Sequence, residues 1–208
     1  MTEGLEAGGE QYNPGEPTTP RQAASVILLR GGSDGLEILL VKRNPDARFM
    51  GGAWVFPGGA VDATEGDDDA AHRVCALRET EEEAGIALPD PAGLVAFSRW
   101  ITPKEVRIRF DTWFYLAPAP PDADPRPDGE ETVDAGWYTP ADALEAHRRG
   151  EILLVFPTIK HLEQIGGFAS ADALLHHARG QEVRPVEPRV LMSGETARIV
   201  LPGEPGYE

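Results

Sequence analysis

Short apolar runs alternate with polar connections along this chain, and most of these runs have the length of β-strands. They occupy residues 23–30, 36–43, 51–59, 94–102, 107–117 and 133–138. Runs of this length between glycine, proline and charged residues are typical of strands. The glycines within residues 31–35 predict a tight connection between the first two runs, and therefore a hairpin.

The main helical pattern covers residues 69–84, and Gly85 follows it as the predicted C-terminal cap. On a helical wheel, Val74, Leu77 and Ala84 fall on one side, which predicts the face that packs on the core. Three further helices are predicted at residues 140–150, 158–165 and 170–178, the first with Pro140 at its first position. Mixed strands with few helices favour an α+β fold or an α/β/α sandwich.

The length of 208 residues suits one domain with a full core. Residues 1–20 are rich in Gly, Pro, Glu and Thr and are predicted to form a flexible leader, which leaves residues 21–208 as a single domain. Residues 117–129 form a proline-rich surface loop, and the tail, residues 183–208, contains strand-like pieces broken by prolines.

The formal net charge of −16 argues against general nucleic-acid binding, which requires a basic surface. No apolar run reaches the length of a membrane span, and the N-terminus lacks the features of a secretory signal. The lone cysteine, Cys75, excludes an internal disulfide, and we expect a cytoplasmic location. The five histidines form no convincing metal-binding pattern.

Glu79, Glu82 and Glu83 share one face of the predicted 69–84 helix, at spacings i, i+3 and i+4. Like charges repel, so their concentration behind a Gly58-Gly59 turn indicates that they hold a cation. Hard divalent ions such as Mg²⁺ take oxygen ligands of this kind, usually alongside substrate phosphates. The alternative is a charged helix face that is simply solvated.

The same stretch resembles the Nudix box, G-x5-E-x7-R-E-U-x-E-E-x-G-U, where U is a bulky apolar residue. The matching residues are Gly59, Glu65, Arg78, Glu79, Glu82, Glu83, Gly85 and Ile86. Thr80 replaces the first bulky apolar residue, and twelve residues instead of seven separate Glu65 from Arg78. The polar insertion G-D-D-D-A predicts a longer loop before the helix. If Glu65 keeps its family role, its carboxylate should lie within about 4 Å of Arg78.

Membership of the Nudix hydrolases would imply an α/β/α sandwich in which a mixed sheet lies between helices and the box forms a loop-helix-loop. It would also imply hydrolysis of a diphosphate, with Mg²⁺ or Mn²⁺ as the cofactor. The glutamates at positions 79, 82 and 83 are the expected metal ligands, and a carbonyl at Gly58 or Gly59 is a further one.

Two catalytic roles also follow from this resemblance. Arg78 is expected to hold one carboxylate by a charge-assisted hydrogen bond. The general base is either Glu82 or an acid outside the box. Glu130 and Glu131 are candidates for that acid, against the alternative that they lie in a solvated loop.

A second resemblance lies upstream of the box. Residues 39–59 are similar to the signature of coenzyme A-cleaving Nudix enzymes, L-L-T-x-R-(S/A)-x3-R-x3-G-x3-F-P-G-G. The matching residues are Leu39, Leu40, Arg43, Arg48, Gly52, Phe56, Pro57, Gly58 and Gly59, while Val41 and Asn44 depart from the pattern. Arg43 and Arg48 are expected to bind phosphates, and Trp100 to stack on a base unless it belongs to the core.

The leading hypothesis is therefore a metal-dependent pyrophosphohydrolase that cleaves coenzyme A or acyl-coenzyme A into 3',5'-ADP and a 4'-phosphopantetheine product. A nucleoside diphosphate sugar, dinucleotide or nucleotide hydrolase with the same metal core is the enzymatic alternative. The non-enzymatic alternative is a catalytically silent nucleotide sensor, although the intact glutamates argue against it. The expected partner is a small-molecule diphosphate, and a homodimer is compatible with the sequence.

Overall fold

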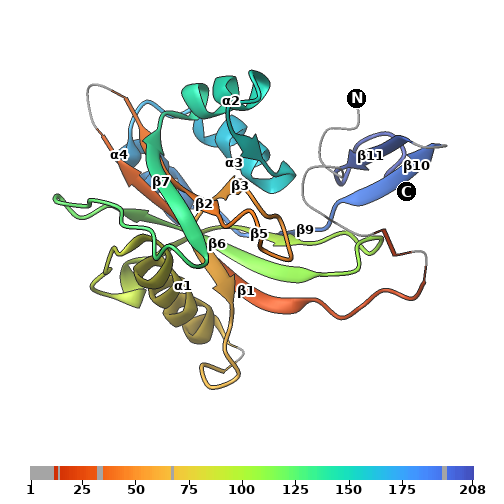
Figure 1. Ribbon diagram of the computed structural model, residues 1–208, viewed down its shortest axis with the longest axis horizontal. Coiled ribbons are helices and arrows are strands. Elements are labelled where there is room, and N and C mark those ends of the chain that lie inside the picture. Colours follow the sequence, from red (N-terminus) through yellow and green to blue (C-terminus); the bar gives the residue numbers. More distant parts are fainter. Residues whose placement is uncertain (1–11, 14, 32–34, 67, 194–195) are drawn as a thin grey trace.

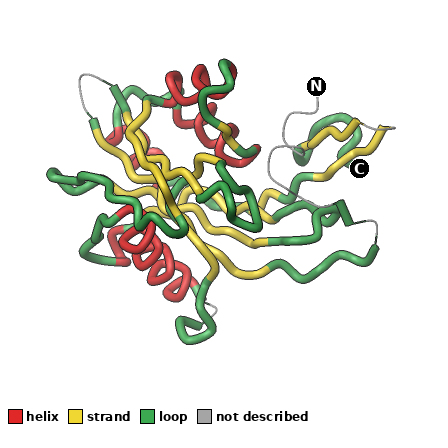
Figure 2. Tube along the Cα trace, in the orientation of Figure 1, coloured by secondary structure: helices red, strands yellow, loops and turns green. Residues whose placement is uncertain are grey.

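The computed structural model describes residues 12–13, 15–31, 35–66, 68–193 and 196–208, and its main body is a mixed β-sheet with helices on both faces (Figures 1 and 2). The nine described strands of this sheet run in the order β8-β3-β2-β1-β6-β5-β9, with β4 paired to β1 and β7 paired to β2. The strands are β1 (Arg21–Arg30), β2 (Glu37–Arg43), β3 (Ala53–Val55), β4 (Gly58–Ala60), β5 (Val95–Ile101), β6 (Phe110–Pro118), β7 (Thr132–Tyr138), β8 (Leu153–Leu154) and β9 (Pro185–Val186).

The helices divide between the two faces of the sheet. Helix α1 covers one face, and α2, α3 and α4 cover the other (Figure 1). Their bounds are α1 (Asp69–Ala84), α2 (Pro140–Arg148), α3 (Phe156–Ile165) and α4 (Ala171–Arg179), with a short 3₁₀ turn at Pro91–Gly93. The predicted α/β/α sandwich with a mixed sheet is confirmed, as is the antiparallel pairing of β1 with β2.

Strand β1 lies at the centre of the sheet and is buried on both faces. Because successive side chains of a strand point to opposite faces, Ile27 and Leu29 join the core under α2–α4. Val26 and Leu28 join the core under α1. Burial on both sides explains why this segment is a continuous apolar run instead of an alternating one.

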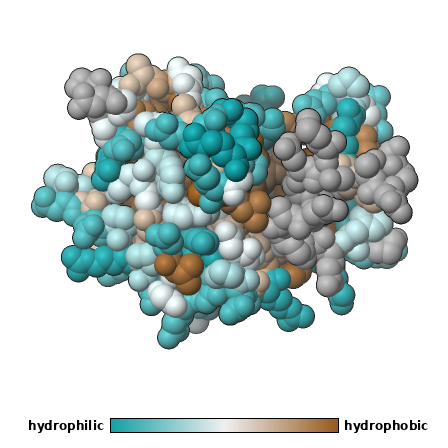
Figure 3. Space-filling view, turned by 45° about the horizontal axis from the view of Figure 1, so that its top comes forward, coloured by the Kyte–Doolittle hydropathy of each residue, from teal (hydrophilic) through white to brown (hydrophobic). Residues whose placement is uncertain are grey.

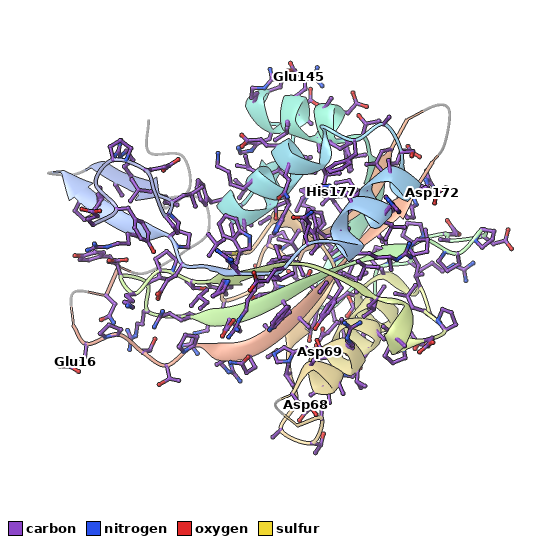
Figure 4. The ribbon with its side chains drawn as sticks, turned by 180° about the vertical axis from the view of Figure 1, so that it is seen from behind. Glu16, Asp68, Asp69, Glu145, Asp172 and His177 are labelled. Atoms are coloured by element: carbon purple, nitrogen blue, oxygen red, sulfur yellow. The ribbon has the colours of Figure 1, made fainter. Side chains whose placement is uncertain are left out.

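Helix α1 begins and ends where the sequence predicts. The Asp68 carboxylate caps its start by accepting a hydrogen bond from the Ala71 N–H (2.9 Å). Gly85 ends it in the left-handed conformation with φ 66°, which glycine adopts without strain. Asp68 and Asp69 of the insertion thus lie at the beginning of the helix (Figure 4), so the insertion contributes to the first turn of α1 and not only to the predicted loop before it.

The helical wheel was right for Ala84 and Leu77, which pack in the core under α1, and wrong for Val74. Val74 is 45% exposed, whereas Cys75, Ala76 and Thr80 are fully buried. The buried face therefore runs along the same side as Glu79 and Glu83, which approach the glycine strand β4. The wheel could not show that Glu79 and Glu83 are themselves buried, because their burial depends on contact with β4.

The C-terminal tail forms a separate two-stranded antiparallel sheet, the C-terminal hairpin, from β10 (Arg189–Ser193) and β11 (Thr196–Val200). It lies beyond the β5–β9 edge of the main sheet (Figure 1). The strand-like pieces predicted for residues 183–208 are confirmed as β9, β10 and β11.

Of the predicted leader, residues 1–11 and 14 lie outside the described residues. Asn13 N–H donates to the Glu105 carbonyl (2.6 Å), and Thr18 Oγ1 donates to the Arg107 carbonyl (2.9 Å). The described part of this segment therefore lies along the connection between β5 and β6. The domain boundary, the homodimer and the cytoplasmic location stay predictions. Within the described chain, no helix has the length and apolar character needed to cross a membrane.

His161 of α3 is a buried, neutral member of the core. It is 1% exposed, its Nε2 lies 2.6 Å from Ser98 Oγ, and its ring packs 4.4 Å from that of Phe114. Burial lowers the pKa of this imidazole from 6.5 to about 3. The charged form is thus excluded from the folded protein over most of the acidic range.

We expect this burial to make the protein less stable in acid. Below pH 6.5 the unfolded chain binds a proton at His161 that the folded protein does not bind until about pH 3. The free energy of unfolding should therefore fall with decreasing pH across this window, by up to about 1.4 kcal/mol per pH unit. Urea unfolding of the wild type and of His161→Gln at several pH values measures the difference. Parallel pH profiles of the two proteins would contradict the prediction.

Candidate active site

Glu83 is a buried carboxylate held against the glycine strand β4. Its Oε2 accepts a hydrogen bond from the Gly58 N–H (2.9 Å), while its Oε1 is buried without a hydrogen-bond partner among the described residues. Burial raises the pKa of Glu83 to about 7, opposed by the Gly58 N–H and the Arg43 charge and reinforced by Glu79 and Glu131. An orphaned carboxylate oxygen in such a place fits a cation as its partner.

Glu79 lies one turn before Glu83 and packs directly on Gly59. A Cβ added at Gly59 would meet the Glu79 carboxyl carbon at 2.4 Å, so only glycine leaves room for this carboxylate. Burial raises the pKa of Glu79, although the Arg78 guanidinium opposes this effect. The Gly59 carbonyl, a predicted metal ligand, faces the Cys75 thiol at 3.6 Å.

Arg78 connects the carboxylates of the box. Its guanidinium donates to Glu65 Oε1 (2.9 Å), to Glu79 Oε1 (2.6 Å) and to Glu82 Oε2 (2.8 Å). The predicted proximity of Glu65 and Arg78 is therefore confirmed in spite of the insertion. Burial alone would raise the pKa of Glu65, but the Arg78 guanidinium and the Asp62 N–H outweigh it and lower the pKa.

Glu82 is the outermost carboxylate of the set, with a side chain 58% exposed. As the side chains lie, no three acidic, histidine or cysteine residues among those described are gathered closely enough to hold an ion. The carboxylates of Glu79 and Glu82 instead share Arg78. The donor set is nonetheless all oxygen and includes Glu83 Oε1, which has no hydrogen-bond partner among the described residues, so these residues fit a hard divalent cation.

The loop before β7 brings Glu131 to the same place. The Asp128 carboxylate accepts hydrogen bonds from the N–H groups of Glu130, Glu131 and Thr132, and Thr132 Oγ1 donates to the Glu83 carbonyl (2.6 Å). Glu131 is exposed and lines the cavity described below, and its charge acts on both Glu79 and Glu83. Glu130 does not line this cavity, so the structure separates the two candidate bases.

The upstream arginines occupy different positions. Arg43 lines the cavity, with its Nη1 3.8 Å from Glu83 Oε1 and its Nε donating to the Phe49 carbonyl (3.3 Å). Arg48 is exposed and lies outside the cavity wall. Gly52 also lies outside it; its φ of 76° and its N–H bond to the Arg43 carbonyl (3.2 Å) give it a role in shaping this loop.

A cavity of about 510 Å³ joins these groups to a large apolar surface. Glu79, Arg78, Glu131 and Arg43 line it, and so does the half-buried Trp100, whose ring meets that of Phe156 at 6.2 Å. Several lining residues were not predicted from the sequence, namely Phe49, Phe110, Phe114, Phe156, Val190 and Ile199. They come from separate segments and share no local motif, so chain order alone does not reveal them.

The fold and this site define a Nudix protein. Residues 19–155 match the family model of the NUDIX domain, and the chain belongs to this family. It is 24% identical to "Acyl-coenzyme A diphosphatase NUDT19" of Homo sapiens, across 92% of this chain and 81% of that protein. It is 27% identical to "Putative nudix hydrolase 7" of Caenorhabditis elegans, across 81% of this chain and 68% of the relative.

Solved structures agree with this assignment. A NUDIX hydrolase from Alicyclobacillus acidocaldarius superposes with a TM-score of 0.69 at 28% identity, covering 76% of this chain and 96% of the other. Together with the intact carboxylate set, these likenesses make the chain an enzyme of the Nudix hydrolase class.

Proposed function

We propose that this enzyme hydrolyses the diphosphate of coenzyme A or of an acyl-coenzyme A, with Mg²⁺ or Mn²⁺ as its cofactor. The observation that carries the proposal is the cavity, where the box residues Arg78 and Glu79 and the cationic Arg43 open onto an extensive apolar surface. The similarity to a human acyl-coenzyme A diphosphatase over most of the chain supports the same substrate class.

In the proposed reaction, water attacks one phosphorus of the diphosphate and the P–O–P linkage breaks. Coenzyme A would yield 3',5'-ADP and 4'-phosphopantetheine, and an acylated substrate would yield the acylated second product. Glu79, Glu82 and Glu83 would hold the cation, which supplies charge neutralisation and lowers the pKa of bound water. Arg78 keeps Glu79 and Glu82 oriented through its short hydrogen bonds.

Two further side chains have roles in this proposal. Glu131 lines the cavity and is exposed, so it can take a proton from the attacking water and release it to solvent. Arg43 faces the same cavity and supplies positive charge for a phosphate oxygen. Glu82 remains the alternative base.

A diphosphate panel tests the proposal. The purified chain is incubated with coenzyme A, decanoyl-coenzyme A, ADP-ribose and NADH, in MgCl₂ and separately in MnCl₂, and the products are separated by chromatography. We expect the two coenzyme A species to have the highest kcat/KM. A clear preference for ADP-ribose or NADH would assign another diphosphate as substrate. Specific binding of a nucleotide without turnover in either metal would indicate a sensor.

We also expect the enzyme to discriminate coenzyme A from its 3'-dephospho form. A charge-assisted contact to the 3'-phosphate contributes roughly 1.5–3 kcal/mol, which corresponds to a preference of about tenfold or more in kcat/KM. Because Arg48 is exposed in the loop that follows Arg43 at the end of β2, we assign this contact to Arg48. Arg48→Ala should reduce the ratio of kcat/KM for coenzyme A to that for its dephospho form by a larger factor than it lowers activity on the dephospho form.

Arg179→Ala is the matched control, because Arg179 is also an exposed arginine and lies at the end of α4, outside the cavity wall. It should leave the ratio unchanged. Equal rates of the wild type on coenzyme A and its dephospho form would exclude recognition of the 3'-phosphate.

A further inference from the structure

The cavity changes character between its two ends. Around α1 and β4 its wall carries Glu79, Arg78 and Asp62. The rest of the wall includes a large aromatic and aliphatic group, namely Trp100, Phe110, Phe156, Pro188, Val190 and Ile199, beside a few polar residues such as Thr102 and Thr158. Seen from outside, hydrophobic side chains reach the surface of the main body in patches among polar ones (Figure 3). A diphosphate would use the first end only.

Much of the apolar wall lies outside the part of the chain that matches the NUDIX domain. That match ends at residue 155. Phe156, Pro188, Val190 and Ile199 all follow it, and the last two belong to the C-terminal hairpin. Val190 and Ile199 are paired across β10 and β11, so their side chains share one face of the hairpin. Val190 is 6% exposed, which shows that this face is packed.

A two-stranded hairpin is marginal on its own in water, so its position depends on contacts to the main body. A buried arginine supplies one anchor. Arg109, 6% exposed, donates to the Thr102 carbonyl (3.0 Å) and to Glu187 Oε1 (2.7 Å). Glu187 immediately precedes the cavity-lining Pro188. The Val190 N–H also donates to Glu105 Oε2 (3.3 Å), which fixes the beginning of β10.

We propose that the C-terminal hairpin forms the subsite for an apolar acyl chain, and that Val190 and Ile199 determine the preferred acyl length. This inference rests on the proposed function, because it assigns the acyl end of an acyl-coenzyme A to this wall. Valine, isoleucine and proline side chains offer no hydrogen-bonding group with which to read the edge of a base. They do offer contact to a flexible hydrocarbon, whose binding improves about fourfold per fully buried methylene.

The test is a series of acyl-coenzyme A substrates of increasing length, from acetyl through butyryl and hexanoyl to decanoyl, with free coenzyme A alongside. For the wild type we expect kcat/KM to rise with length and then level off, with decanoyl at least tenfold above acetyl. Val190→Phe fills the subsite and should reduce the decanoyl-to-acetyl ratio by fivefold or more. Ile199→Ala removes apolar contact instead and should lower the same ratio.

Met192→Phe is the matched control, because Met192 lies on the same strand, is 47% exposed and does not line the cavity. It should leave the ratio unchanged. Thermal unfolding of each variant shows whether it folds. If Val190→Phe does not fold, the decanoyl-to-acetyl ratio of Ile199→Ala tests the proposed subsite. A flat dependence on acyl length with intact coenzyme A cleavage would overturn this inference alone. Cleavage of ADP-ribose or NADH without cleavage of any coenzyme A species would overturn the proposed function and this inference with it.

Discussion

Glu83→Gln is expected to reduce turnover by about 100-fold to 1000-fold at saturating magnesium, the usual effect of removing one group that stabilises transition-state charge. The variant loses the charge of a carboxylate whose Oε1 is buried without a hydrogen-bond partner among the described residues, with Arg43 Nη1 at 3.8 Å. Its amide can still accept from the Gly58 N–H, so we expect the fold to be retained. Steady-state kinetics on the best substrate of the diphosphate panel, with circular dichroism, measures both effects.

Two further variants accompany this measurement. Glu82→Gln should also lower turnover strongly, because Glu82 belongs to the same proposed ligand set. Glu81→Gln is the control: Glu81 carries the same charge on the same helix, but its side chain is exposed and lies outside the cavity wall. Near wild-type turnover in both Glu83→Gln and Glu82→Gln would refute the metal assignment.

Gly59→Ala is expected to abolish most activity while leaving much of the stability. The added Cβ would lie 2.4 Å from the Glu79 carboxyl carbon, so this side chain must move away from the proposed metal site. We expect turnover to fall by about 100-fold, comparable to the loss of one catalytic electrostatic group. The melting temperature should change less, because the clash involves the end of a flexible side chain.

At the neighbouring Gly58, substitution by alanine should lower the stability of the protein more than Gly59→Ala does. At Gly58 an added Cβ would lie 2.5 Å from the Ala24 carbonyl oxygen and 2.7 Å from the Ser25 Cα, so the backbone of β1 or β4 must shift. Overpacking of this kind costs about 1–3 kcal/mol, and we expect Gly58→Ala to unfold at lower temperature. Gly93→Ala meets nothing within 4 Å and should be neutral. A larger stability loss in Gly59→Ala than in Gly58→Ala would contradict this assignment.

Local features of the fold and site were predictable because local sequence determines them. The bounds of α1 follow from a capping aspartate and a terminal glycine, and the contact of Arg78 with Glu82 follows from their i,i+4 spacing on the helix. The β1–β2 hairpin follows from two apolar runs around a glycine-rich connection. In each case the residues that decide the structure are neighbours along the chain.

Features that depend on distant packing were not predictable in the same way. Glu79 and Glu83 of α1 pack on the glycines of β4, and Val74 is exposed although the helical wheel placed it on the core face. The Ser98–His161 hydrogen bond joins residues 63 positions apart. The apolar cavity wall combines β5, β6, α3 and the C-terminal hairpin, and no periodicity within one segment indicates that these segments meet.

The ion pair between Glu65 and Arg78 has a consequence for how relatives of this chain are recognised. Their side chains meet at 2.9 Å although twelve residues separate them where the family pattern has seven. Asp68, Asp69 and Ala70 of the insertion form the cap and first turn of α1, so the longer spacing in sequence does not keep the two side chains apart. Searches that require a fixed gap would overlook such chains. Alignments that tolerate loop expansion at this point should recover them without loosening the requirement for either residue.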